Sequence, residues 1–165
     1  MKKILSVLFS MVLLVLSLAG CGSGNGLTKA EREAQVTRQV QDALDTRHYT
    51  IAVDWMKPLG GMPRHVSSNY ELTVNGDEVV SYLPYVGEAY RLPYGGGKGL
   101  NFSERIGSYR ESQKNKGERQ IEINVTNEED TYIYLIKVFS NGNSSIDVTS
   151  RQRDHISYSG ELEVK

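Results

Sequence analysis

The spacing of apolar residues changes once along this chain, near residue 48. Over residues 29–47 apolar side chains recur at helical intervals, whereas from residue 49 onward apolar and polar residues alternate. Helical intervals predict one amphipathic helix, and alternation predicts β-strands with one buried face. Thr28 and Glu31 have the spacing of a capping box at the start of that helix. The apolar stripe of the helix consists of Ala30, Val36, Val40, Ala43 and Leu44.

That stripe is narrow, and the rest of the predicted helix is strongly charged. A narrow stripe predicts that the helix docks along one side of a sheet, with its polar face in solvent. The alternative is a helix lying on a membrane surface, which would need larger apolar residues and a basic face. The segment has neither feature.

Eight segments have the alternation of strands, and turn residues separate them. The clearest turn follows residue 74, because Asn75-Gly76 has the left-handed preference that a two-residue hairpin requires. The predicted strands cover residues 49–56, 70–74, 78–83, 105–113, 119–126, 131–139, 144–150 and 154–164.

Two of these strands carry more specific predictions. The face of residues 49–56 that we expect to be buried consists of Tyr49, Ile51, Val53 and Trp55. Residues 131–139 are apolar on both faces. We therefore expect this strand to be central, with the core on one side and the helix or a second sheet on the other.

Eight short antiparallel strands joined by hairpins predict a mainly β fold. The expected architecture is an antiparallel barrel or sandwich preceded by one amino-terminal α-helix, which packs outside it or across an opening. Residues 28–165 are long enough for a single domain with a sizeable core.

The amino terminus predicts export from the cytoplasm. Lys2 and Lys3 precede an apolar run over residues 4–19. That run is shorter than the ~20 residues of a membrane-spanning helix, and it is typical of a signal peptide. We expect the signal peptide to cover residues 1–20.

The end of the signal peptide predicts a lipid anchor. Leu18-Ala19-Gly20-Cys21 resembles the bacterial lipobox, in which the cysteine sulfur receives a diacylglyceryl group. Cys21 is the only cysteine, so its lipidation would leave no thiol for a disulfide or for redox chemistry. Residues 21–27 then form the lipidated cysteine and a flexible tether. Gly22 after the cysteine resembles the pattern exported to the outer membrane, facing the periplasm.

The charge of the mature chain argues against a nucleic-acid partner. Without Lys2 and Lys3 the sequence has 17 basic and 20 acidic residues, a formal charge of −3. Binding to phosphate backbones requires a basic stripe. The basic cluster of this chain, residues 114–119, surrounds Gly117 and is typical of a solvated hairpin tip.

Residues 82–102 interrupt the strands with two copies of Leu-Pro-Tyr and a run of glycines. Proline lacks the backbone N–H of a central strand, and glycine opens backbone angles that other residues avoid. Tyrosine suits a half-buried pocket wall, although tyrosines can also simply cover the end of a barrel. We predict that residues 85–99 form a mobile flap that contacts a ligand. The candidate ligand-binding residues are Tyr85, Tyr90, Arg91 and Tyr94.

The remaining motifs predict no metal and no cofactor. The histidines lie far apart and lack metal-ligand spacing. Asp154 and His155 are strand neighbours that point to opposite faces, which favours a polar pair over a proton relay. Residues 127–130 are acidic enough for calcium but are typical of a solvated hairpin loop. Residues 94–99 lack the spacing of a phosphate-binding loop.

Three segments together carry a family resemblance. They are Leu83-Pro84-Tyr85-Val86-Gly87-Glu88-Ala89-Tyr90, Gly99-Leu100-Asn101-Phe102 and Ile156-Ser157-Tyr158-Ser159-Gly160. The chain resembles domain of unknown function family 4251, a group of bacterial lipoproteins, from about Val36 to Leu162. That family has no assigned activity, so the resemblance implies a fold and a location only.

These observations favour a lipoprotein of the outer membrane that acts as a non-catalytic binding or envelope-interaction module. Its partners would be the membrane, through the lipid, and a small molecule or an envelope protein. A hydrolase with paired carboxylates and a structural accessory of an envelope complex are the alternatives. A deep apolar pocket near Tyr90 would favour ligand binding, two facing buried carboxylates an enzyme, and a bare hydrophobic strand edge a partner protein.

Overall fold

The computed structural model describes residues 27–91, 97–115 and 117–164. The first element is helix α2, Lys29–Thr46, which confirms the predicted helix. The Thr28 hydroxyl accepts the Glu31 N–H at 3.3 Å, and the Glu31 carboxylate accepts the Thr28 N–H at 2.7 Å. The capping box predicted from the sequence is therefore present. Within the described residues, no helix is both long and apolar enough to cross a membrane.

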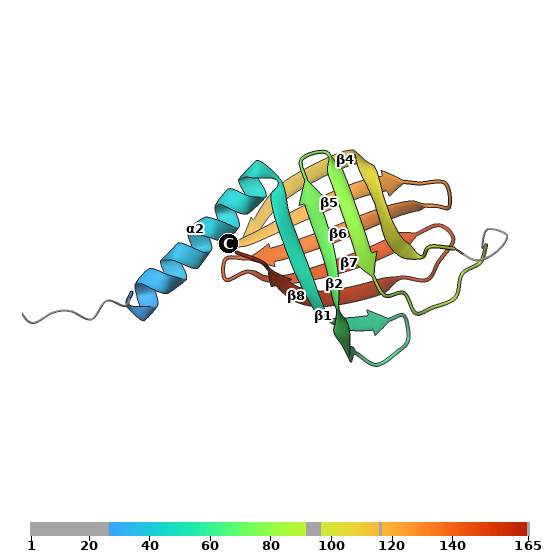
Figure 1. Ribbon diagram of the computed structural model, residues 1–165, viewed down its shortest axis with the longest axis horizontal. Helices are drawn as coiled ribbons and strands as arrows, with labels where there is room; N and C mark the ends of the chain where they lie inside the picture. The colour runs from blue at the N-terminus through green and yellow to red at the C-terminus, as the bar shows by residue number, and fades with distance from the viewer. Residues whose placement is uncertain (1–26, 92–96, 116, 165) are drawn as a thin grey trace, which may run out of the picture.

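Eight antiparallel strands follow the helix and close into one barrel in chain order, with β8 pairing back to β1 (Figure 1). The predicted mainly β fold is confirmed, and the structure decides for a barrel over a sandwich. The strands are β1 (His48–Pro58), β2 (Arg64–Asn75), β3 (Glu78–Leu83), β4 (Leu100–Asn115), β5 (Glu118–Thr126), β6 (Thr131–Phe139), β7 (Asn143–Ser150) and β8 (Ile156–Leu162).

Side chains fill the interior of the barrel. Alternate residues of each strand point inward, as in Ile121 and Ile123 of β5 and Ile136 of β6, all of which are fully buried. Large tyrosines occupy the remaining volume. The Tyr134 hydroxyl, whose pKa burial raises, donates to Ser81 Oγ at 3.1 Å, and Ser81 Oγ donates to the Leu100 carbonyl at 2.7 Å. The Tyr134 and Ser81 hydroxyls thus have hydrogen-bond partners inside the barrel.

A β-bulge changes which residues of β1 face the core. The pairing of β1 with both of its neighbours shifts register between Val53 and Trp55. Beyond the bulge Met56 points inward, whereas Trp55 is 46% exposed. The prediction that Trp55 shares the buried face was therefore wrong, because one extra residue inverts the alternation.

The tight turn between β2 and β3 lies one residue later than predicted. Asn75 still pairs with Glu78, so the two loop residues are Gly76 and Asp77. Gly76 has a φ of 63°, and its N–H donates to the Arg47 carbonyl at 2.8 Å. A single left-handed glycine at the first loop position therefore makes this hairpin.

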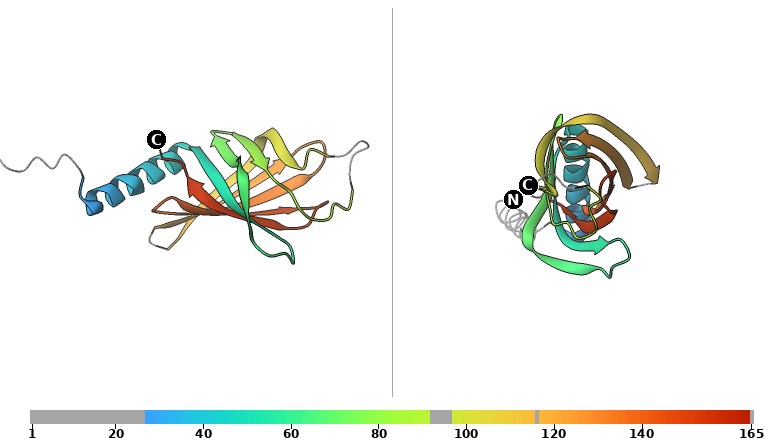
Figure 2. Two further views of the ribbon diagram at one scale, coloured as in Figure 1. Left: turned by 60° about the horizontal axis from the view of Figure 1, so that its bottom comes forward. Right: turned by 90° about the vertical axis from the view of Figure 1, so that its right-hand side faces the viewer.

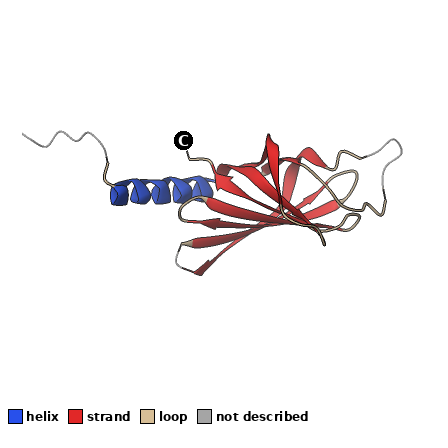
Figure 3. Cartoon of the chain, turned by 90° about the horizontal axis from the view of Figure 1, so that it is seen from below, coloured by secondary structure: helices blue, strands red, loops and turns tan. Residues whose placement is uncertain are grey.

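Helix α2 lies across one opening of the barrel and extends away from it (Figures 1 and 2). Val40 and Leu44, near its carboxyl end, are buried against the core, whereas its first two turns are exposed. The outer face of β6 is left open, with Ile133 42% and Phe139 43% exposed. The prediction that the helix or a second sheet covers β6 was wrong, because the helix packs on β1 at the end of the barrel instead of along a strand face (Figure 3).

Candidate binding surface at the far end of the barrel

The end of the barrel opposite α2, here called the far end, is closed by connections between strands. In an antiparallel barrel alternate connections lie at the same end, so four of them meet there. They are residues 59–63, 84–99, 127–130 and 151–155, of which 92–96 lie outside the described residues.

The segment 84–91 lies against the turn between β7 and β8. Ala89 pairs with Arg153 as an isolated antiparallel bridge. The Tyr90 N–H donates to the Gln152 carbonyl at 2.8 Å, and the Asp154 N–H donates to the Glu88 carbonyl at 3.1 Å. Backbone pairing therefore fixes this part of the predicted flap on the barrel.

The Asp154 carboxylate holds the same segment with its side chain. It accepts the Tyr90 hydroxyl at 2.5 Å and the Glu88 N–H at 3.0 Å. These two hydrogen bonds lower the pKa of Asp154 because they favour its charged form, and the bond from Tyr90 has the larger effect. The bond to Asp154 raises the pKa of Tyr90 for the complementary reason. The Tyr90 ring remains 64% exposed, so its hydroxyl is fixed while its face meets solvent.

Tyr85 joins the segment to the core. Its hydroxyl donates to the Glu88 carbonyl at 2.7 Å, and burial raises its pKa. The Arg153 guanidinium lies 5.5 Å from the centre of its ring, within the range of a cation–π contact. One residue earlier, the Pro84 carbonyl accepts the buried Tyr158 hydroxyl at 2.7 Å.

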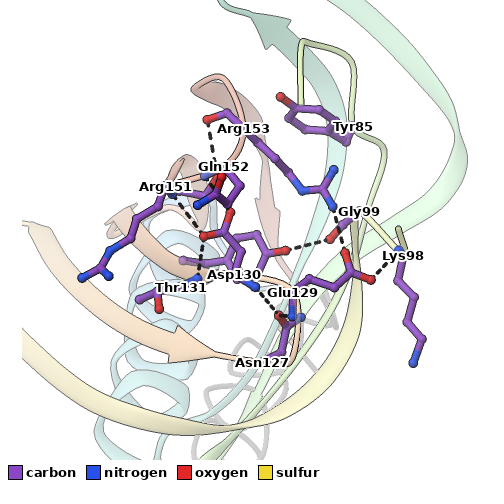
Figure 4. Close-up of polar contacts among 12 residues, drawn as sticks. Tyr85, Lys98, Gly99, Asn127, Glu129, Asp130, Thr131, Arg151, Gln152 and Arg153 are labelled. Atoms are coloured by element: carbon purple, nitrogen blue, oxygen red, sulfur yellow. Dashed lines mark hydrogen bonds and ion pairs between the residues drawn. The ribbon is translucent and has the colours of Figure 1, made fainter. Parts of the chain in front are cut away.

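A buried ion pair lies beneath the segment (Figure 4). Arg153 Nη2 and Glu129 Oε2 are 2.8 Å apart, and the two side chains are 5% and 13% exposed. The Lys98 N–H donates to the other Glu129 oxygen at 2.8 Å. A Cβ atom at position 97 would lie 2.7 Å from the Glu129 carboxylate, so any larger residue there would require the ion pair to shift. Arg153 Nε is buried without a hydrogen-bond partner among the described residues.

The loop between β5 and β6 is organised by its own acidic and amide side chains. The Asp130 carboxylate accepts the backbone N–H groups of Thr131 at 2.7 Å, Arg151 at 3.2 Å and Gln152 at 3.0 Å. The Asn127 side-chain carbonyl accepts the N–H groups of Glu129 and Asp130. These oxygens therefore stabilise two loops. Among the described residues no group of three His, Asp or Glu side chains is placed to hold a metal ion.

The structure brings together three of the four predicted ligand-binding residues. Tyr85 is half-buried, and Tyr90 and Arg91 are exposed on the same segment. Tyr94 lies outside the described residues, as do Gly95 and Gly96, where the predicted flap motion would concentrate. The exposure of Tyr90 is incompatible with the alternative in which its ring caps the core. A ligand-binding role for these residues stays a prediction.

Sequence reasoning missed Arg153 and Glu129 as partners. Glu129 was assigned to a solvated hairpin loop, and Arg153 lay in the short connection between two predicted strands, to which no role was given. The available signal was topological: in a closed antiparallel barrel these two connections share an end with residues 84–99. An arginine and an acid in neighbouring loops are then candidates for a pair.

The described acidic side chains and histidine of the far end are not arranged as facing carboxylates or as a catalytic triad. Glu129 is paired with Arg153 and Asp130 with backbone N–H groups, so these two carboxylates do not face each other. His155 and Asp154 have separate partners, as expected for strand neighbours: His155 Nε2 lies 3.0 Å from Ser157 Oγ, on the outer surface. Ser157 donates to Asp147 at 2.7 Å, and Asp147 Oδ1 lies 3.6 Å from the same His155 nitrogen, Nε2. In a catalytic triad the carboxylate contacts the other imidazole nitrogen, which faces away from the serine.

Two hollows of the described surface lie at the helix end. One, of about 550 Å³, runs between α2 and the starts of β1 and β2, with Ala43 and Val74 in its wall. The other, of about 440 Å³, lies beside the β2–β3 turn and is lined by Asp77, Glu78 and Arg105 among others. Neither is the apolar pocket near Tyr90 that would favour a small-molecule ligand. Every strand of the barrel has two neighbours, but residues 106–115 of β4 pair with β5 alone and residues 64–70 of β2 pair with β1 alone, so these stretches keep an unpaired edge. Both stretches are mostly polar, unlike the bare hydrophobic edge expected for an accessory protein.

The chain is thus a filled, closed antiparallel barrel with an amino-terminal helix across one end. It belongs to the family described as "Domain of unknown function (DUF4251)", whose match covers residues 31–162. This confirms the resemblance inferred from the sequence. Comparison with curated proteins gives no match.

A solved structure shares the fold. The crystal structure of a DUF4251 family protein from Bacteroides eggerthii DSM 20697 is similar to this chain with a TM-score of 0.64 and 15% sequence identity. The similarity covers 79% of this chain and 89% of that chain. At this identity the likeness supports the fold alone.

Proposed function

We propose that this protein is a lipoprotein of the outer membrane, facing the periplasm, and that it acts as a non-catalytic binding module. Its binding surface would be the exposed side of residues 85–91 at the far end. Two observations support this function: the lipobox-like sequence that ends in Cys21, and the barrel interior, which is filled by side chains. Contact with a partner then has to occur on the outside.

The observation that carries the binding role is the exposure of a fixed aromatic ring. Tyr90 is held by Asp154 through its hydroxyl and by Gln152 through its N–H, yet its ring is 64% exposed. Ordering a side chain before binding removes part of the entropy cost of association. A rigid aromatic side chain with a polar tip is typical of the anchor residues that dominate protein interfaces. Because Tyr90 and Arg91 are both exposed on this surface, it offers an aromatic face and a positive charge to a protein or a polymer.

Co-purification from native membranes tests the binding role. We expect Tyr90→Ala to lower the affinity for the captured partner by more than tenfold, since loss of an aromatic anchor commonly costs ~2 kcal/mol or more of binding free energy. Its melting temperature should change little because the ring is exposed. Tyr82→Ala is the matched control, since Tyr82 is also exposed, at 48%, but lies on β3. Equal capture by Tyr90→Ala and the unchanged protein would exclude this surface as the binding site.

Fatty-acid labelling tests the anchor separately. Cys21→Ser removes the sulfur that would receive the diacylglyceryl group, so labelled fatty acid should disappear from the chain. Labelled lipid retained on the Cys21→Ser variant would refute the lipoprotein assignment.

A further inference from the structure

The connection between β1 and β2, residues 59–63, exposes large apolar side chains on a fixed loop. Leu59 is 62% exposed and Met62 is 85% exposed. Four residues before Leu59, the bulge in β1 turns the Trp55 side chain outward. The loop is held in place, because the Leu59 N–H donates to the His155 carbonyl at 3.2 Å and the Gly61 N–H donates to the Pro58 carbonyl at 3.0 Å. Apolar side chains fixed in solvent gain free energy when a partner removes them from water.

Basic side chains surround this apolar tip. Two exposed basic residues flank the loop. Lys57 is the penultimate residue of β1, and Arg64 is the first residue of β2. His65 follows, with its ring 5.6 Å from that of Trp55 in an edge-on contact. Residues 55–70 contain no aspartate or glutamate. The loop is therefore an apolar tip with a basic collar, in a mature chain whose formal charge is negative.

This combination matches the surface of an anionic bilayer. Leucine and methionine enter the acyl boundary, tryptophan prefers the level of the headgroups, and lysine or arginine pairs with anionic lipid. An interface with a folded protein would instead require a complementary pocket for the protruding tip. We propose that residues 55–65, the hairpin tip, make a second contact with the membrane by inserting into an anionic phospholipid surface.

The arrangement of the molecule permits this contact beside an amino-terminal anchor. In Figure 1 the tip of the β1–β2 hairpin projects below the barrel, away from the other three connections of the far end, and α2 slopes downward toward its amino end. Both therefore lie on the lower side of the molecule in that view. One flat surface can then meet the tip and the start of the helix. The Tyr90 surface, at the far end, would remain accessible to a partner. Only this two-point geometry rests on the proposed lipid anchor; the chemistry of the tip does not.

An environment-sensitive fluorophore on Met62→Cys tests the proposal in the lipidated chain, reconstituted into vesicles. Because Cys21 would carry lipid, the chain should take up one label, and uptake of two labels would show that the anchor is absent. We expect the emission of the label at position 62 to shift to the blue and to rise about twofold or more on vesicles containing phosphatidylglycerol, as the label leaves water. The matched label on Glu128→Cys, an exposed position in another connection of the far end, should stay unchanged.

Charge variants test the basic collar without touching the apolar tip. Lys57→Gln and Arg64→Gln should each reduce the ratio of inserted to free tips about fivefold, the effect of one basic residue near an anionic surface. Arg105→Gln, an exposed residue of β4, is the control and should have no effect.

Three results would overturn the proposal. They are an unshifted label at position 62 on anionic vesicles, equal shifts on anionic and on pure phosphatidylcholine vesicles, and a shift that requires an added protein. If two labels per chain show that the anchor is absent, the same spectra are recorded on the processed chain with Cys21→Ser and an excess of vesicles. A blue shift there supports the tip contact without the anchor, and its absence overturns the contact as well.

Discussion

The two ends of this barrel are closed in different ways, although each has an arginine paired with an acidic side chain. At the helix end, Arg119 contacts Glu111 and reaches Asp45 of α2 at 2.6 Å, with the arginine side chain 23% and Asp45 63% exposed. At the far end, Arg153 and Glu129 are almost fully buried. An ion pair open to water contributes little to stability, whereas breaking a buried pair leaves a charge without compensation.

This difference indicates separate tasks for the two ends. The helix end is held mainly by apolar contacts, with Val40 and Leu44 of α2 buried in the core. The far end is held by a polar network that fixes loop backbone from three connections. Such a network orders its surface in advance and so can present the exposed Tyr90 ring. The variants below test whether the ends differ in this way.

The largest effect is expected from Glu129→Gln. This change leaves the Arg153 guanidinium buried without its counter-charge, so we expect a loss of about 3–5 kcal/mol in the free energy of unfolding. Urea denaturation measures it. Glu128→Gln is the matched control, because the neighbouring side chain is exposed.

A double variant sharpens the interpretation of that result. Replacing the pair by Arg153→Met and Glu129→Met should recover much of the loss, since apolar side chains of similar volume often substitute for a buried pair. If Glu129→Gln costs no more than Glu128→Gln, the buried pair does not stabilise the far end.

A smaller effect is expected from Asp45→Asn at the helix end. The Asp45 side chain is 63% exposed in its ion pair with Arg119, so we expect a loss of about 1 kcal/mol or less, and less still at high salt. Denaturation at low and high salt concentration measures both quantities. A loss as large as that of Glu129→Gln would abolish the distinction between the two ends.

The smallest effect concerns the pH dependence of the far end. The folded state lowers the pKa of Asp154 below its ordinary value of 3.8. A lowered carboxyl pKa means that the contribution of Asp154 to stability is present above the ordinary value and is lost as pH falls through 3.8 and below. The Glu88 N–H signal in an NMR titration should therefore move with a midpoint below 3.8.

The variant Asp154→Asn tests whether the Asp154 carboxyl causes the change in the Glu88 signal. The acid-induced movement of the Glu88 signal should disappear in Asp154→Asn and persist in Asp54→Asn, which changes an exposed carboxylate of β1. A midpoint above 3.8, or movement that persists in Asp154→Asn, would mean that Asp154 does not hold this segment.

Much of the architecture could be predicted because it depends on local periodicity. The helix and all eight strands are present, since a helix or strand is recognisable from about ten consecutive residues. However, β2 begins at Arg64 and β4 at Leu100, earlier than the predicted residues 70 and 105, so residues 100–102 lie in a strand and not in the irregular connection predicted for them. The errors have local physical causes that the periodicity does not contain. One bulged residue turned Trp55 outward, and one shifted loop position placed Gly76 rather than Asn75 first in the turn.

The candidate site was predictable only in part. The unusual composition of residues 82–102 marked Tyr85, Tyr90 and Arg91, because proline, glycine and tyrosine stand out in any strand-rich chain. Asp154 and Arg153, which position that segment, are more than 60 residues away in sequence from Tyr85 and Tyr90. Nothing in their immediate neighbours indicates those partners.

The sequence by itself therefore determined the elements, their order and the lipobox-like amino terminus. Only the tertiary structure decided that the sheet closes into a barrel, that α2 covers one end and that four connections meet at the other. The physical reason is that closure depends on the summed twist and register of all eight strands. The partner of a loop residue such as Arg153 is then set by which connections closure brings together, and not by the residues beside it in the chain.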